Sequence, residues 1–185
     1  MAREQSTTEA LGLSVLRANG IQRFVQKMAA TRPCSWLLQR TVYPFDKVLY
    51  KRSNGRVTLP GLLAGIPVVM LTTVGVKSGE KRTIPLLGIP MDDGSVAVIG
   101  SNFGQKSTPG WVYNLRANPT ARVGFRGRHV GVRARRANAD EAEIAFAAAA
   151  PIYGGFASYR TRATHRTIEV FLLDPDVSEP ADRSG

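Results

Sequence analysis

A glycine-containing turn with several cations and hydroxyls is the part of this sequence whose residue types most suggest binding chemistry. Residues 71–86 run from an apolar segment through Gly75 and Gly79 into a second apolar segment. The polar side chains at the turn are Lys77, Lys81, Arg82, Thr73, Ser78 and Thr83. Glycines allow a positive φ, so backbone N–H groups can curl into an anion-binding concavity, and the cations suit a phosphate or clustered carboxylates. The alternative is an ordinary hairpin with a solvated basic turn, since no helix follows as in a nucleotide-binding loop.

Two other groups of side chains could line a pocket beyond the turn. The loop 101–104 leaves a predicted strand with a hydroxyl, an amide and a glycine, which lets backbone approach a planar ring, and Trp111 follows it. Tyr153, Phe156 and Tyr159 recur every three residues, and phenols there could donate hydrogen bonds or a proton. The alternatives are a polar loop with Trp111 as a core anchor and an aromatic cluster that seals the mouth of a barrel.

No metal-binding or hydrolytic pattern accompanies these groups. The only histidines and cysteine are His129, His165 and Cys34, whose spacing does not suit metal ligation. There is no G-x-S-x-G elbow, and Asp92 with Asp93 reads as a turn rather than an acid–base pair. We therefore predict no metal, and we expect any enzymatic reaction to be carried by a bound organic cofactor.

The chain is strongly basic, with a formal net charge of +11 over 185 residues. Residues 1–60 hold ten Lys and Arg against three Asp and Glu, whereas residues 61–185 hold fifteen against eleven. Such a surface attracts polyanions: nucleic acid, anionic lipid or a polyanionic cofactor. The single cysteine and the lack of a membrane span or signal pattern favour a cytoplasmic location. The basic apolar segment 11–56 either covers one side of the domain or lies on an anionic membrane.

The remaining elements predict a mainly β fold with inserted helices. Strands are expected at residues 66–73, 83–89, 95–101, 121–125, 129–136 and 167–173, with helices at 109–117 and after Asn138. Residues 1–10 are expected to be disordered. About six strands in antiparallel order with short helices indicate a small barrel or sandwich. We expect a helical extension over 1–60, a cofactor-binding domain over 61–175 and a polar tail over 176–185.

In order along the chain, several segments resemble the deazaflavin-dependent nitroreductase family of actinobacteria. The matching segments are 65–73, 75–79 with Arg82, 85–86, 109–119 and 152–153, and the resemblance covers about residues 45–175. It implies an FMN-binding-like split β-barrel that binds coenzyme F420, a hydride carrier with a phosphate and a polyglutamate tail. It also implies an oxidoreductase that reduces an enone, a quinone or a nitro-heterocycle.

The resemblance also implies roles for individual residues. Those expected to bind the phosphate and tail are Lys77, Ser78, Gly79, Lys81 and Arg82. Those expected beside the ring or the substrate are Thr83, Pro85, Ser101, Asn102, Phe103, Gly104, Trp111 and Asn114. Ser101, Tyr153 and Tyr159 are expected to contact the substrate. Phe156 departs from the tyrosine often found in the family, which removes one phenol, and the bulky Phe103 is expected to narrow the pocket.

Other functions remain alternatives at this point. An FMN-dependent enzyme on the same barrel would bind FMN and not the deazaflavin, and a storage protein would bind the deazaflavin without turnover. A nucleic-acid-binding protein is not expected, because the aromatic residues do not interleave with the basic ones. The expected partners are a small-molecule acceptor, a second copy of the chain in a homodimer, and an anionic membrane surface through the N-terminal segment.

Overall fold

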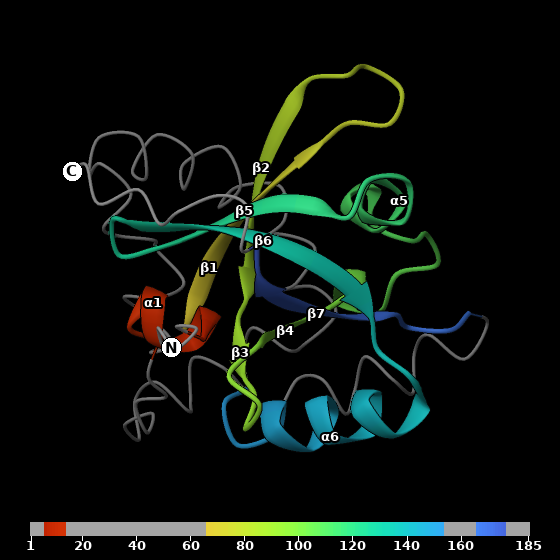
Figure 1. Cartoon of the computed structure of the whole chain (residues 1–185). Helices are drawn as coiled ribbons and strands as arrows, with labels where there is room; N and C mark the ends of the chain where they lie inside the picture. The colour runs from red at the N-terminus through yellow and green to blue at the C-terminus, as the bar shows by residue number, and fades with distance from the viewer. Residues whose placement is uncertain (1–5, 14–65, 154–165, 177–185) are drawn as a thin grey trace.

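The structure is a computed structural model that describes residues 6–13, 66–153 and 166–176, and one antiparallel sheet of seven strands lies at its centre (Figure 1). The strands are β1 (Val68–Val74), β2 (Lys81–Leu87), β3 (Ile89–Pro90), β4 (Val96–Ile99), β5 (Thr120–Phe125), β6 (Arg128–Arg136) and β7 (Val170–Pro175). The helices are α1 (Thr7–Leu11), α5 (Gly110–Ala117), α6 (Ala139–Ala149) and a short 3₁₀ helix, Asn102–Gly104. The mainly β fold with inserted helices is confirmed, with seven strands where about six were expected.

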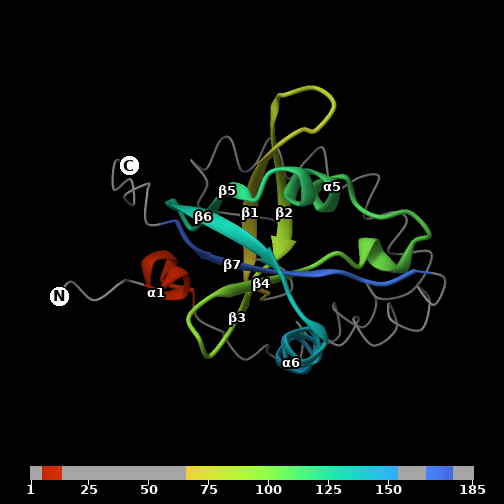
Figure 2. The ribbon, with the colours of Figure 1, turned by 45° about the vertical axis from the view of Figure 1, so that its right-hand side comes forward.

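The two edge strands of the sheet are consecutive in the chain. The strand order is β2-β1-β5-β6-β7-β4-β3, yet only Gly88 separates β2 from β3. A flat sheet cannot place two strands joined by one residue at its opposite edges, so the sheet must curl. Figures 1 and 2 show β2 continuing into β3 as one segment. The Gly88 N–H donates to the Pro67 carbonyl at 2.9 Å, and a Cβ at residue 88 would lie 2.5 Å from Val69 Cγ1.

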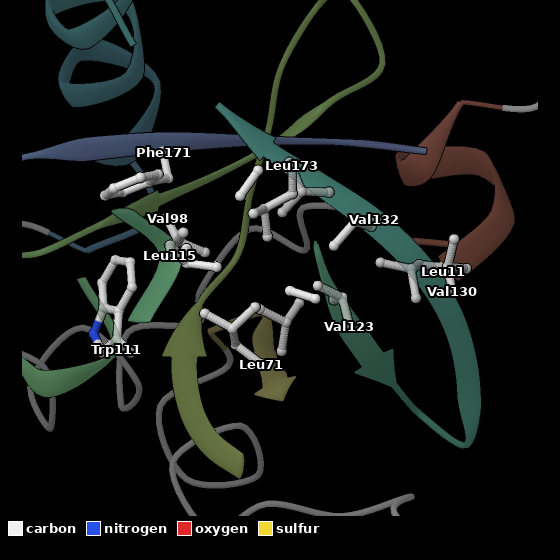
Figure 3. Packing of buried hydrophobic residues seen from close by; sticks show 14 of the residues in the cluster. Leu11, Leu71, Val98, Trp111, Leu115, Val123, Val130, Val132, Phe171 and Leu173 are labelled. Carbon is white, nitrogen blue, oxygen red and sulfur yellow. The ribbon is translucent and has the colours of Figure 1, made fainter. Parts of the chain in front are cut away.

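Alternate residues of the strands face two separate apolar clusters, as a period of two requires. Inside the curl, Leu71, Val98 and Phe171 pack with Trp111 of α5 and with Leu11 (Figure 3). The other faces of β4 and β7 pack against α6. Members of this second cluster are Ala97, Ile99, Val170, Leu172, Ala145, Ala149 and Ile152. The sheet thus has one cluster shared with α1 and α5 and another shared with α6.

The expectation that residues 1–10 are disordered is wrong for residues 6–10. Ser6 caps α1 by accepting a hydrogen bond from the Glu9 N–H, and Thr8 Oγ1 lies 2.9 Å from the Gly94 carbonyl. Leu11 and Leu13 are buried in the inner cluster, and burial of these leucines stabilises the segment against the barrel. Residues 14–60 of the expected extension, and the tail beyond Asp176, lie outside the described residues.

Arg135 of β6 joins several elements on the surface near the β3–β4 turn. Its guanidinium contacts Glu141 of α6 at 2.6 Å, Asp174 of β7 at 3.1 Å and Asp93 of the turn at 3.8 Å. Hydrogen bonds from Ser95 lower the pKa of Asp93, and the Asn138 N–H together with Arg135 lowers the pKa of Glu141. The network therefore stabilises the fold when both carboxyl groups are ionised.

We expect Gly88→Ala to destabilise the fold by about 1–3 kcal/mol, because the added methyl group would overlap the buried Val69 side chain. Gly110→Ala is the matched control, since a Cβ at residue 110 meets nothing within 4 Å. Denaturant unfolding of both variants measures the difference. Equal free energies of unfolding for the two variants would contradict the close approach of Gly88 to β1.

We expect the fold to lose stability as the pH falls below the ordinary pKa values of Asp93 and Glu141, 3.8 and 4.5. Both pKa values are lower in the folded chain, so the unfolded chain binds more protons in this range and stability decreases with falling pH. Asp93→Asn with Glu141→Gln should flatten this part of the pH profile. Unfolding curves at several pH values test it, and an unchanged slope in the double variant would be the opposing result.

Candidate functional site

The basic turn between β1 and β2 is held by hydrogen bonds that its backbone N–H groups donate within the turn and to Asn114. The bonds are Gly75 N–H to the Glu80 carbonyl (2.8 Å), Gly79 N–H to the Gly75 carbonyl (2.8 Å) and Val76 N–H to Asn114 Oδ1 (3.1 Å). Only Gly79 of the two turn glycines takes a positive φ, +67°. These three N–H groups already donate within the protein, so they are not open to an anion. The expected anion-binding concavity stays a prediction for the remaining N–H groups of the turn, and the exposed side chains are the other candidate ligands.

The side chains of the turn are exposed and mostly cationic. Lys77, Lys81 and Arg82 are all exposed, and the Arg82 side chain keeps 61% of its surface accessible. Arg82 Nη2 lies 3.4 Å from Ser78 Oγ and 3.7 Å from Glu80 Oε2. The turn thus holds one carboxylate and three cations, and both ions of the Arg82–Glu80 pair are too exposed for the pair to be strong. The turn keeps an excess of positive charge available to a ligand.

Asn114 of α5 fixes this turn to the body of the protein. Its Nδ2 donates to Thr73 Oγ1 at 3.0 Å, and its Oδ1 accepts the Val76 N–H. The residue is only 9% exposed, and both ends of the amide are occupied. Asn114, which was expected beside the cofactor, therefore acts here as an anchor for the turn. Figures 1 and 2 both show the β1–β2 hairpin projecting beyond the sheet with α5 near its base.

Trp111, the other expected pocket residue of α5, lies in the core. It is 6% exposed, and its ring packs edge-to-face on Phe171 with centroids 5.8 Å apart. Figure 3 shows both rings within the inner cluster. The interpretation of Trp111 as a core anchor, which the sequence left open, is the one that matches its position. Trp111 shapes the site by fixing α5 against β7.

The outer face of β2 carries two of the residues expected beside the ring. Thr83 and Pro85 alternate with Ile84 and Leu86, which pack against the inner cluster, so the first pair faces outward. Thr83 Oγ1 lies 2.8 Å from the hydroxyl of Thr72, its cross-strand partner. The hydroxyls on this face are thus held on regular strands that run directly into the basic turn.

The loop at residues 101–104 is a tight 3₁₀ helix with a strained backbone. Ser101 is 7% exposed, and its carbonyl accepts the Gly104 N–H at 2.9 Å. Asn102 takes φ +46°, a left-handed conformation that is unfavourable for a residue other than glycine. Its side chain donates to the Ser107 carbonyl at 2.9 Å. Phe103 lies in the same turn. Hydrogen bonds within the loop therefore fix its conformation without a ligand.

Arg166 and Glu169 hold this loop and its flanks from the start of β7. The Arg166 guanidinium donates to the carbonyls of Gly100, Ser101 and Gln105. Burial of this guanidinium lowers its pKa from the ordinary value. The buried Glu169 carboxylate accepts hydrogen bonds from Arg116 of α5, which raise the pKa of that arginine, and lies 3.5 Å from Arg136 Nε.

No sequence pattern indicated a role for Arg166 or Glu169. Arg166 and Glu169 occur in and after an irregular aromatic segment, and their side-chain contacts lie between 33 positions (Glu169 to Arg136) and 66 positions (Arg166 to Gly100) away along the chain. Contacts at such separations leave no periodic pattern. The two residues are recognisable only once β4 and β7 are paired.

Tyr153 packs against a different apolar cluster from the one that contains Trp111 of α5. It is half-buried against the cluster between the sheet and α6. Tyr159 and Phe156 fall outside the described residues, so their expected contacts stay predictions. Contacts of α5 with the turn and with the β7 region thus connect the turn to the loop. Tyr153 packs with α6.

Within the part of the chain that the structure describes, no three His, Cys, Asp or Glu side chains are grouped as metal ligands. In the same residues, no helix is both long and apolar enough to cross a membrane.

Comparison with known families adds to this geometry. Residues 45–175 match the family described as F420H(2)-dependent quinone reductase, which is well over half of the chain. The chain belongs to the F420H(2)-dependent quinone reductase family. The family resemblance predicted from the sequence is confirmed.

Individual members of the F420H(2)-dependent quinone reductase family and solved structures agree with this assignment. An F420H(2)-dependent quinone reductase of Mycobacterium tuberculosis H37Rv is 32% identical over 89 residues, which are 47% of this chain and 57% of that protein. The match thus spans little more than half the length of the curated relatives. The solved structure of an F420-H2 dependent reductase, FDR-A, is 35% identical, with a TM-score of 0.53 over 58% of this chain and 93% of its own. The predicted split β-barrel is confirmed.

A second solved structure, described as a domain-swapped dimer, is 30% identical to this chain. Its TM-score is 0.55, and the match covers 76% of this chain and 98% of the solved one. The likeness therefore extends over nearly the whole of that structure.

For a member of the F420H(2)-dependent quinone reductase family, the residues at the turn fit the cofactor in the family's name. The phosphate and carboxylates of F420 need cations and hydrogen-bond donors that remain accessible. Lys77, Lys81 and Arg82 supply the cations, and the Ser78 hydroxyl adjoins Arg82. The donor set therefore matches a polyanionic tail.

We expect Asn114→Ala to destabilise the protein by about 1–3 kcal/mol and to speed hydrogen exchange over residues 73–80, because the variant leaves the Val76 N–H and the Thr73 hydroxyl without their partner. Asn118→Ala, at the residue that follows the same helix, is the control, since its exposed amide accepts a single N–H from Thr120. Exchange measured by mass spectrometry separates the two. Equal protection of the turn in both variants would show that Asn114 does not anchor it.

Proposed function

We propose that this chain is an oxidoreductase that binds reduced coenzyme F420 and reduces an electron-poor acceptor, with quinones as the first class to test and enones and nitro-heterocycles next. The observation that carries the proposal is the rigidly held, exposed cationic turn in a chain of this family. Its excess positive charge matches a phosphate with a polyglutamate tail.

The turn and the loop would bind different parts of the ligands. Lys77, Lys81 and Arg82 would hold the phosphate and the tail by charge-assisted hydrogen bonds, with Ser78 and Gly79 shaping the turn. Thr83 and Pro85 would lie beside the ring from the outer face of β2. The loop of residues 101–104 would line the ring or the acceptor from the other side of α5. Anchoring both segments before binding lowers the entropic cost of assembling the site.

When bound, the reduced deazaflavin supplies a hydride. The chain's own residues would hold the acceptor close to it, which removes much of the entropic part of the barrier. The Ser101 hydroxyl or a phenol would stabilise the oxygen that gains charge on the acceptor. Tyr153, Tyr159 or water would supply the proton that follows. The low exposure of Ser101 restricts access of acceptors to its hydroxyl.

Two further features belong to this proposal. A homodimer is supported by the related structure described as a domain-swapped dimer. Peripheral binding to the inner face of the cell membrane is supported by the excess of basic residues in positions 1–60 and would bring the protein to apolar quinones. Size-exclusion chromatography with light scattering tests the first, and flotation with anionic and neutral vesicles tests the second.

Cofactor titration separates the proposed activity from its alternatives. Purified protein is titrated with F420 and with FMN, and oxidation of F420H2 is then followed with menadione, cyclohexenone and a nitroimidazole. Binding of F420 with turnover of one acceptor supports the proposal. Binding of FMN alone would favour an FMN enzyme on the same barrel, and F420 binding without turnover would favour a storage protein.

We expect Lys77→Ala with Arg82→Ala to weaken F420 binding by about 10–100-fold while leaving the unfolding midpoint nearly unchanged, because both side chains are exposed. Arg126→Ala with Arg128→Ala removes two exposed cations from the β5–β6 turn, beyond the opposite end of β5 from the basic turn. Fluorescence titration of both double variants measures the affinities. Equal losses would mean that overall charge, and not this turn, attracts the cofactor.

A further inference from the structure

One guanidinium holds three backbone carbonyls of the loop that follows β4. Arg166 Nη1 lies 3.1 Å from the Gly100 carbonyl oxygen, Nη2 lies 2.8 Å from that of Ser101, and Nε lies 3.2 Å from that of Gln105. We propose that Arg166 is a positioning residue that holds this loop in the form that receives the cofactor ring and the acceptor. The inference rests on the proposed function and assigns Arg166 no contact with either ligand.

The geometry of the loop explains why an arginine is suited to this position. Three carbonyl oxygens converge on one point, which requires several donors in fixed directions. A guanidinium has five N–H donors in a rigid plane, whereas a lysine ammonium is a single point of charge on a flexible stem. The loop between these carbonyls includes Asn102 at φ +46°. The hydrogen bonds from Arg166 offset the unfavourable backbone conformation, which would otherwise relax.

The start of the loop is held from two directions by the same short segment. The Gly100 N–H donates to the Glu169 carbonyl at 2.8 Å, while its own carbonyl accepts from Arg166. A Cβ at residue 100 would lie 3.0 Å from Val112 Cγ2 of α5 and 3.1 Å from the Glu169 carbonyl oxygen. Gly100 therefore sits between α5 and the segment that leads into β7, and the loop begins from a fixed point.

The charge of Arg166 is maintained although the group is partly buried. Burial lowers its pKa, but an arginine starts so far above neutrality that it remains protonated, and the Glu169 carboxylate nearby opposes the shift. Glu169 is engaged by Arg116 and Arg136 through its side chain, so it is not free to form a closed pair with Arg166. All three guanidinium nitrogens (Nε, Nη1 and Nη2) can thus donate to backbone oxygens.

The position of Arg166 predicts an effect that differs from the effect of the basic turn. The turn would set affinity for the anionic tail, whereas the loop would set the placement of the reacting groups. A displacement of about 1 Å at a reacting centre can lower a rate by about 100-fold. We therefore expect Arg166→Ala to lower kcat by about 10–100-fold while the Kd for F420 changes by less than about threefold.

The experiment compares Arg166→Ala, Arg166→Lys and the unmodified protein, with Arg135→Ala as the matched control. Arg135 also bridges several partners, but they are the carboxylates of Asp93, Glu141 and Asp174 rather than loop carbonyls. The measurements are Kd for F420, kcat and KM for menadione, unfolding midpoint, and hydrogen exchange over residues 100–107. Guanidinium chloride far below denaturing concentrations is then added to Arg166→Ala to test chemical rescue.

Support for the assignment is a fall in kcat in Arg166→Ala with F420 affinity retained, faster exchange in the loop, partial recovery with added guanidinium, and little recovery in Arg166→Lys. Arg135→Ala should lower the unfolding midpoint without changing kcat or loop exchange. Normal kcat in folded Arg166→Ala, or loop exchange equal to that of the unmodified protein, would overturn the assignment. Absence of F420 binding by the unmodified protein would overturn the proposed function instead, and faster loop exchange in Arg166→Ala would still support the part of the inference that concerns the loop.

Discussion

The covalent link through Gly88 is the constraint on which the rest of the structure depends. Because one residue joins the two edge strands, the sheet has to curl, and the curl creates an inside and an outside for every strand. The inner cluster then fixes α5 through Trp111, and α5 in turn carries Asn114 to the basic turn. The site is thus positioned by the closure of the sheet and not by the turn itself.

The site separates the residues that hold backbone from those that remain open to a ligand. Asn114 is buried and Arg166 is partly buried, and the hydrogen bonds they make fix the turn and the loop. Lys77 and Arg82 are exposed and make few contacts. A buried polar group must be satisfied within the protein, so it serves best as an anchor, whereas an exposed cation can exchange water for a ligand at low cost.

The elements that depend on local patterns were predictable, and those that depend on distant contacts were not. Short apolar runs bounded by turn residues located the strands, and Asn138 with Glu141 formed the expected start of α6 as a capping box. Residues 1–10 were expected to be disordered, whereas residues 6–10 are ordered because the neighbouring Leu11 and Leu13 are buried in a core formed by distant strands. The turn was expected to offer free N–H groups, but the Asn114 side chain, 38 residues away, occupies one of them. Arg166 was missed for the same reason, since backbone carbonyls carry no sequence signal.

The net charge of +11 shows where a polyanion would be attracted only when the carboxylates that pair with each cation are known. The structural arginines face carboxylates: Arg116 and Arg136 meet Glu169, and Arg135 meets three acidic side chains. The basic turn holds one carboxylate, Glu80, for its three cations, and Glu80 lies 3.7 Å from Arg82. Paired charges contribute little to the field that a ligand experiences, so attraction of a polyanion should concentrate where compensation is weakest. We therefore expect affinity for a polyanionic cofactor to depend on this turn more than on the basic composition of the chain.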